Sequence, residues 1–222
     1  MWRNPEAFVK IIREQTWAEE WAEEDALWEH LNRSLKEELL PQFLTQITRQ
    51  VDEITEIDPD LSEPEILSRA TRYMVDFLGA LSSSVRIYDP LTGQMLSYGS
   101  YPSEERARVT YIPLENTVAG EVVKTQRTYL VPNITTDDLY KDKDVVNRKG
   151  AHSVVAVPLI IPRFFMRERD TVGVIQIYFP EEDRVFAPLE IQMAELMARR
   201  LSFVIARKKI LSMNRVNEKK ET

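Results

Sequence analysis

Apolar residues recur at helical spacing along the N-terminal quarter of the chain. Over residues 4–57 they follow one another at steps typical of a helix or heptad, and acidic residues occupy the other faces. Pro41 interrupts this pattern and should kink or restart the helix, since proline cannot donate a backbone hydrogen bond. The apolar stripe consists of Trp17, Trp21, Trp28, Leu31, Leu35, Phe43, Ile47, Val51 and Ile54. We predict an amphipathic helical segment that packs on a partner.

A turn and a second helix follow. Residues 57–61 combine aspartate with proline, which favours a linker, so we expect a domain boundary there. Ser62 and Glu65 have the spacing of a capping box, and Gly79 is a typical helix stop. Between them, apolar residues at helical spacing predict an amphipathic helix.

The rest of the chain alternates between strand and helix patterns. Period-two alternation and turn residues predict strands over 84–88, 95–98, 109–112, 129–134, 153–160 and 172–179. A short helix is expected over 117–125 and a long one from Pro188, with its core stripe along Leu189, Met193, Leu196, Met197, Leu201 and Val204. Phe203 and Ile210 begin a second stripe on this helix. The pattern predicts an α+β domain with about six strands in an antiparallel sheet.

Composition excludes several classes of function. The chain has 222 residues, a net charge of −7 and no cysteine. The acidity argues against binding nucleic acid, and the longest apolar run, residues 154–161, is too short to cross a membrane. The absence of cysteine excludes disulfides and thiolate metal sites. Because no apolar signal core is present at the N-terminus, we expect a cytoplasmic protein without a nucleic-acid or membrane partner.

The ordered blocks from residue 62 to residue 207 resemble a GAF domain, a regulatory module that binds ligands and dimerises. The resemblance implies a PAS-related antiparallel sheet with helices on both faces. It also implies a cavity between the central strands and residues 114–150, and polar positions on the strands independently favour Ser84, Arg86, Ser153, Gln176 and Tyr178 as lining residues. Further candidates for the ligand-binding pocket are Asn116, His152, Tyr111, Tyr129 and Tyr140, of which the tyrosines could instead plug the cavity.

The resemblance also argues against particular ligands. Members that bind cyclic nucleotides carry an Asn-Lys pair where this chain has Tyr178-Phe179, and an Asp-Glu pair where it has Glu190-Ile191. Members that hold a bilin or an iron–sulfur cluster, or that reduce methionine sulfoxide, need cysteines. His152 is better explained as a hydrogen-bonded structural residue than as a haem ligand. We therefore expect no cofactor.

Other acidic and basic clusters have simple interpretations. The acidic cluster over residues 19–25 is best explained as a solvated helix face, and residues 137–144 lack EF-hand spacing. No phosphate loop, nucleophile elbow or paired-histidine helix occurs, so we expect neither a catalytic nor a metal site. The basic residues 207–220 are expected to pair with the acidic N-terminal helices, within one chain or across a dimer, rather than with nucleic acid or lipid.

Three functions remain open. The first is a non-enzymatic regulatory protein that forms a homodimer through residues 1–57 and the long last helix, with residues 62–207 as the GAF domain and 208–222 as an extension. The second is a sensor in which a small molecule shifts that helix and so a protein partner or a missing output domain. The third is a scaffold with a closed pocket. The expected interface residues are Trp17, Trp21, Trp28, Leu31, Leu35, Phe203 and Ile210.

Overall fold

The computed structural model describes residues 30, 33–89, 94–102, 111–140, 143, 150–161 and 170–218. The chain divides into two compact units, residues 1–49 and 50–222, and the division falls inside helix α3 (Leu40–Thr55). The predicted helix upstream of residue 30, with Trp17, Trp21 and Trp28, lies outside the described residues, as does Leu31. The domain boundary expected at residues 57–61 stays a prediction.

Helix α3 is preceded by a π-helical turn, η1 (Leu35–Leu39). The backbone N–H of Leu40 donates to the carbonyl of Leu35, one residue further back than in an α-helix. This wider turn comes directly before Pro41, which has no N–H to donate, and the carbonyl of Pro41 accepts the Thr45 hydroxyl at 2.8 Å. The helix therefore passes the proline through a π turn and continues.

Helix α4 (Glu63–Leu78) begins and ends as its sequence predicts. The Ser62 hydroxyl accepts the Glu65 N–H, and the Glu65 carboxylate accepts the Ser62 N–H at 3.0 Å, which completes the capping box. Gly79 ends the helix with a left-handed backbone, φ 65°. The capping signal thus fixed the start of the helix correctly.

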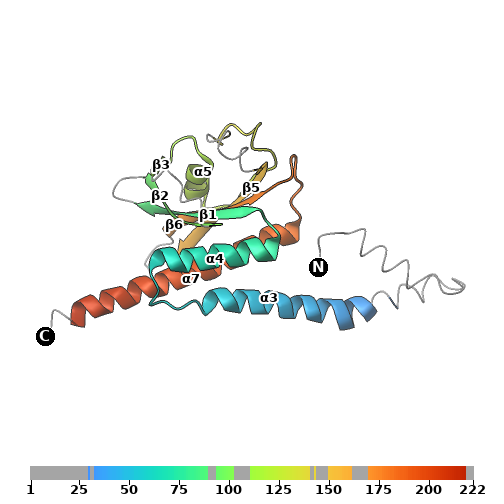
Figure 1. Cartoon of the computed structure of the whole chain (residues 1–222), viewed down its shortest axis with the longest axis horizontal. Helices are drawn as coiled ribbons and strands as arrows, with labels where there is room; N and C mark the ends of the chain where they lie inside the picture. The colour runs from blue at the N-terminus through green and yellow to red at the C-terminus, as the bar shows by residue number, and fades with distance from the viewer. Residues whose placement is uncertain are drawn as a thin grey trace, which may run out of the picture. The chain divides into compact units, whose positions relative to one another are not determined.

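A single antiparallel sheet forms the centre of the second unit (Figure 1). In the described residues it has six strands in the order β3-β2-β1-β6-β5-β4. Their bounds are Ser82–Asp89 for β1, Gln94–Tyr101 for β2, Tyr111–Pro113 for β3, Tyr129–Val131 for β4, Ser153–Ile161 for β5 and Asp170–Phe179 for β6. The predicted α+β plan is confirmed, although β4 is shorter than expected; residues 109–110, the expected start of β3, lie outside the described residues.

The two faces of the sheet carry different layers. Helices α4 and α7 (Pro188–Glu218) cover one face, and the short helix α5 (Val118–Thr125) lies on the other (Figure 1). Along β6, Ile175 and Ile177 belong to the core shared with α4 and α7, whereas Val174 and Tyr178 belong to the core shared with α5. The central strands β5 and β6 are therefore buried on both faces.

Two cations of α7 hold the turn that precedes α4. The Arg207 guanidinium donates to the carbonyl of Ile57 at 3.0 Å. The Lys208 ammonium donates to the carbonyls of Pro59 at 3.1 Å and Leu61 at 2.5 Å. These two residues thus bond to main-chain carbonyls of the linker, while their expected pairing with the acidic N-terminal helices stays a prediction.

Arg184 organises the turn between β6 and α7. Its guanidinium contacts the carboxylates of Glu181 and Glu190, each at 2.7 Å, and lies 4.3 Å from the centre of the Phe179 ring. Glu190 also accepts the N–H of Ala187 at 2.9 Å, next to the start of α7. This cluster fixes the beginning of α7 against the end of β6.

Helix α5 approaches the preceding loop very closely at Gly120. A Cβ atom added there would lie 1.7 Å from the carbonyl oxygen of Leu114, which is backbone and cannot rotate away. The Gly120 N–H donates to the hydroxyl of Thr117, the N-cap of the helix, at 3.1 Å. Only glycine allows the loop and the helix to meet in this way.

We predict that Gly120→Ala destabilises the domain by about 3 kcal/mol, because the loop and the helix must separate to admit one carbon. Gly150→Ala is the control, since Gly150 has φ +72° but no atom of the described residues within 4 Å of an added Cβ, so only backbone strain of about 1 kcal/mol is expected. Urea unfolding followed by circular dichroism measures both free energies. Equal losses for the two variants would contradict the close approach.

Candidate functional site

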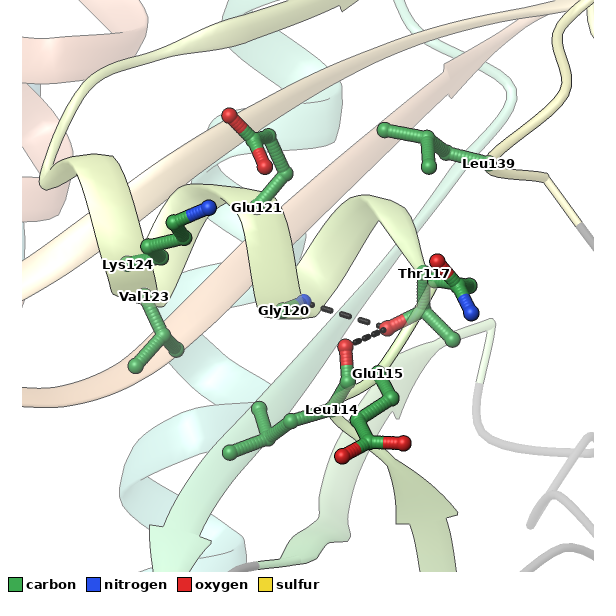
Figure 2. Close-up of a pocket in the computed structure, with 9 residues that line it drawn as sticks. Leu114, Glu115, Thr117, Gly120, Glu121, Val123, Lys124 and Leu139 are labelled. Atoms are coloured by element: carbon green, nitrogen blue, oxygen red, sulfur yellow. Dashed lines mark hydrogen bonds between the residues drawn. The ribbon is translucent and has the colours of Figure 1, made fainter.

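A pocket of about 400 Å³ lies beside helix α5 (Figure 2). It opens between the first turns of the helix, the loop before it and the segment that carries Leu139. The described residues that line it are Leu114, Glu115, Asn116, Thr117, Gly120, Glu121, Val123, Lys124 and Leu139. All of them come from residues 114–139, and none from the central strands.

Thr117 sets the geometry of the pocket at the start of α5. Its hydroxyl accepts the Gly120 N–H and lies 3.1 Å from the carbonyl of Leu114 (Figure 2). The same hydroxyl lies 3.0 Å from the carbonyl of Pro113. Asn116, the residue before this cap, has a positive φ of 54°. The loop therefore turns sharply into the helix and leaves a hollow in front of it.

Asp137 fixes the opposite wall. One carboxylate oxygen accepts the backbone N–H groups of Leu139 at 2.9 Å and Tyr140 at 3.0 Å, and the other accepts the Tyr129 hydroxyl at 3.2 Å. Burial raises the pKa of Tyr129, and the negative charge of Asp137 raises it further. Asp137 is thus a structural residue, and no cluster of metal-ligating side chains occurs in the described part of the chain.

The lining offers contacts for binding. Glu115, Asn116 and Lys124 are exposed at its rim, while Leu114, Val123 and Leu139 contribute half-buried apolar surface. The described lining contains no histidine, cysteine or serine, and the hydroxyl of Thr117 already caps the helix. Such a set can hold a small polar molecule but supplies no nucleophile paired with a base.

Three of the predicted site residues meet elsewhere, on the face of the sheet that α5 covers. The Tyr178 hydroxyl donates to the Gln176 side-chain oxygen at 3.1 Å and lies 3.4 Å from the Ser84 hydroxyl. Gln176 is 1% exposed and Tyr178 is 8% exposed. Arg86 is half-buried on the same strand face as Ser84. The strand alternation therefore predicted correctly that these four residues share one face of the sheet, where three of them are in contact.

Apolar packing occupies much of the described region between α5 and the sheet. Tyr140 and Tyr178 are buried there with Val118, Val122 and Val154. Tyr129 is half-buried and packs against the same cluster. The side chain of Tyr111 is outside the described part of the structure. The described tyrosines thus pack against or within this core, as the closed-pocket alternative expects.

Ser153 lies on the other face of the sheet from its predicted position, and His152 lies near a carboxylate. Ser153 is paired in register with Phe179, so its side chain points to the face covered by α7, away from Gln176. This corrects the prediction for Ser153. The prediction used the polarity of the side chain, which does not determine the face of the sheet on which it lies. The Nδ1 atom of His152 lies 3.4 Å from the Glu182 carboxylate but has no hydrogen-bond partner in the described residues.

Sequence reasoning identified only Asn116 among the residues that line the pocket beside α5. It missed Glu121, Lys124 and Leu139 because a pocket built from a loop and a helix end leaves no periodic signal. The spacing of Thr117 and Gly120, an N-cap residue with glycine three positions later, was the one available local indication.

The predicted interface residues are only partly described. Leu35 is 49% exposed on the helix before Pro41. Phe203 is half-buried on α7, and Ile210 lies in α7 beyond the residues whose side chains are described. Among the described residues, no helix combines the length and apolar character that a bilayer span requires.

Comparisons with solved structures find the same fold in several proteins. The GAF domain of a phosphoenolpyruvate-protein phosphotransferase from Coxiella burnetii superposes with a TM-score of 0.64 at 17% identity, over 76% of this chain and 96% of that one. The corresponding domain from Acinetobacter gives 0.61 at 17%, over 76% and 95%. Free methionine-R-sulfoxide reductase from Neisseria meningitidis, in complex with its substrate, gives 0.60 at 13%, over 74% and 89%.

A comparison with curated proteins finds no match. The family model described as GAF domain, in contrast, matches residues 60–206, well over half of the chain, and agrees with the sheet order, the helical layers and the solved structures. The chain belongs to the GAF domain family.

Proposed function

We propose that this chain is a non-enzymatic regulatory protein that dimerises through its N-terminal helices and α7 and senses a small molecule in its GAF domain. The observation that carries this proposal is the continuity of α7. Met197 and Leu201 of this helix are fully buried against the sheet, and the same helix runs on to Glu218, beyond the family match that ends at residue 206. Helix α7, as one rigid element, would therefore transmit a shift of the sheet beyond the domain.

The linker before α4 supports this role for α7. Arg207 and Lys208 bond to the linker carbonyls immediately after the buried stretch of the helix. Any rotation of α7 would break these bonds or move the linker with it. Since α3 leads directly into this linker, the bonds offer a connection between the GAF domain and the helical segment.

The apolar surface before and within α3 supports dimerisation. Leu35, Leu40 and Leu44 are 49%, 47% and 52% exposed. The π turn makes a step of five residues from Leu35 to Leu40 span about one helical turn, so the three leucines follow one side of the helix. A second copy of the same stripe would cover this surface in a symmetric dimer.

The small-molecule site that we propose is the pocket beside α5. It combines a volume of about 400 Å³ with Glu115, Glu121 and Lys124 as charged groups and an apolar inner wall. Val118 and Val122 of the same helix pack in the core below it. A molecule that moved α5 would thus disturb the packing on the central strands.

A scaffold with a closed pocket is the second candidate function. The burial of Tyr140 and Tyr178 in the core under α5 favours it, because those side chains occupy the face where a sensor of the expected kind would hold its ligand. In this case the N-terminal helices would dock a protein partner without any ligand.

We predict that Leu40→Glu with Leu44→Glu converts the dimer into a monomer, raising the dissociation constant roughly 100-fold or more, because two charges per chain would be buried. Gln42→Glu with Gln46→Glu adds the same charge at exposed positions on the opposite side of α3 and should leave the dimer intact. Sedimentation equilibrium measures both. A leucine variant that remains dimeric at wild-type strength would refute this interface.

Trp21→Glu with Trp28→Glu tests the upstream part of the predicted seam and should also give monomers. If only the tryptophan variant dissociates, dimerisation depends on the upstream residues and not on the leucine stripe.

Native mass spectrometry of the gently purified protein tests sensing. We expect a dimer that carries a discrete extra mass. Lys124→Trp, an exposed residue that lines the pocket, should fill it and remove that mass, whereas Thr125→Trp, its exposed neighbour outside the lining, should retain it. A bare dimer for all three proteins would favour the scaffold.

A further inference from the structure

A second hollow, of about 410 Å³, lies at the edge of the sheet beside β4. Strand β4 pairs with β5 only at Val154, Val155 and Ala156. On that side, no strand in the described chain pairs with residues 157–161. Within the described residues, the second half of β5 thus has no partner strand on that side, and the hollow lies between it, the residues before β4 and α7.

An open strand edge can accept a further strand, because its backbone groups on that side have no partner strand. Pro158 agrees with this position, since proline within a sheet is confined to edges and bulges. Its missing N–H restricts the register of an added strand. Because alternate residues of β5 direct their N–H and carbonyl groups to β6, only the others among residues 157–161 can bond to an added strand.

The floor of this edge groove is apolar. Val157 and Pro158 are buried, Ile160 of β5 and Ile191 of α7 are half-buried, and Leu130 of β4 is 36% exposed. A strand laid beside β5 would point alternate side chains toward this surface. The groove thus suits every second side chain of an extended, apolar segment.

The rim of the groove carries positive charge. Arg127 and Arg199 are both exposed, and the Arg199 side chain is 74% accessible. The one acidic residue of the lining, Glu195, already accepts the Thr128 hydroxyl at 2.6 Å and lies 3.7 Å from Arg199. In a chain of net charge −7, this edge is locally basic and complements an acidic partner.

We propose that this groove binds an extended acidic peptide segment of a partner protein, added as a strand beside residues 157–161. Apolar side chains of the peptide pack against the apolar floor of the groove between β5 and α7. Its aspartates or glutamates meet Arg127 and Arg199 at the rim. The site is separate from the pocket beside α5 and shares no lining residue with it.

Selection from a display library of random dodecapeptides tests the proposal on the full chain. We expect the enriched peptides to alternate apolar residues with others and to be rich in aspartate and glutamate. A fluorescein-labelled copy of the most enriched peptide should lose roughly tenfold or more in affinity for Arg127→Glu with Arg199→Glu. Arg69→Glu with Arg72→Glu, at exposed positions of α4, makes the same change in charge and should bind like wild type.

Hydrogen exchange identifies the mode of binding. The peptide should protect those backbone amides of residues 157–161 that point away from β6, because the alternate amides already bond to β6 and Pro158 has none. Thermal melting checks that both variant pairs are folded, and Arg127→Gln with Arg199→Gln provides a milder version of the same test with an intermediate loss expected.

Three results would overturn the proposal. The first is enrichment of peptides without acidic residues, and the second is equal binding to the groove and α4 variants. The third is a changed oligomeric state of the groove variant in light scattering, which would make this edge an interface between copies of the chain.

Discussion

The pairing of β5 with β6, buried on both faces, is the constraint on which the rest of the domain depends. The two strands pair in register from Ser153 opposite Phe179 to Ile161 opposite Asp170, with one irregularity after Leu159. Helices α4 and α7 pack on one side of this pair, and α5 packs on the other. Every buried backbone group in such a pair needs a partner, so neither strand can shift without disturbing both helical layers.

This arrangement also places α5 and α7 on opposite faces of the same two strands. Side chains of α5 contact β5 and β6 from one side, and Met197 and Leu201 of α7 contact the same sheet from the other. The polar contacts among Ser84, Gln176 and Tyr178 lie on the α5 side. If the proposed sensing occurs, a perturbation at α5 would have to pass to α7 through these two tightly packed strands, and the sheet itself would have to move.

Much of the fold could be predicted because its signals are local. The capping box at Ser62 and Glu65, the left-handed stop at Gly79 and the strand alternation before Phe179 each act within a few residues. The π turn before Pro41 could not be predicted, because a proline indicates that the helix is disturbed but not which backbone geometry results. The face that Ser153 occupies was predicted wrongly. Which residues of β5 face α7 depends on the register of β5 with β6, and the sequence of one strand does not show that register. The bonds from Arg207 and Lys208 to the linker join segments distant in sequence, and the pocket beside α5 forms between a loop and a helix end without a periodic pattern, so only tertiary packing reveals either of them.

The bonds between α7 and the linker have a consequence for how this junction can vary among related sequences. The acceptors are main-chain carbonyls, which any residue provides, whereas the donors are the side chains of Arg207 and Lys208. Substitutions in the linker that preserve its backbone path leave the carbonyl acceptors in place. Loss of either cation, in contrast, leaves its acceptors without their donor. We therefore expect selection on this junction to act mainly on two positions of α7, so that the linker can diverge in sequence while the contact persists.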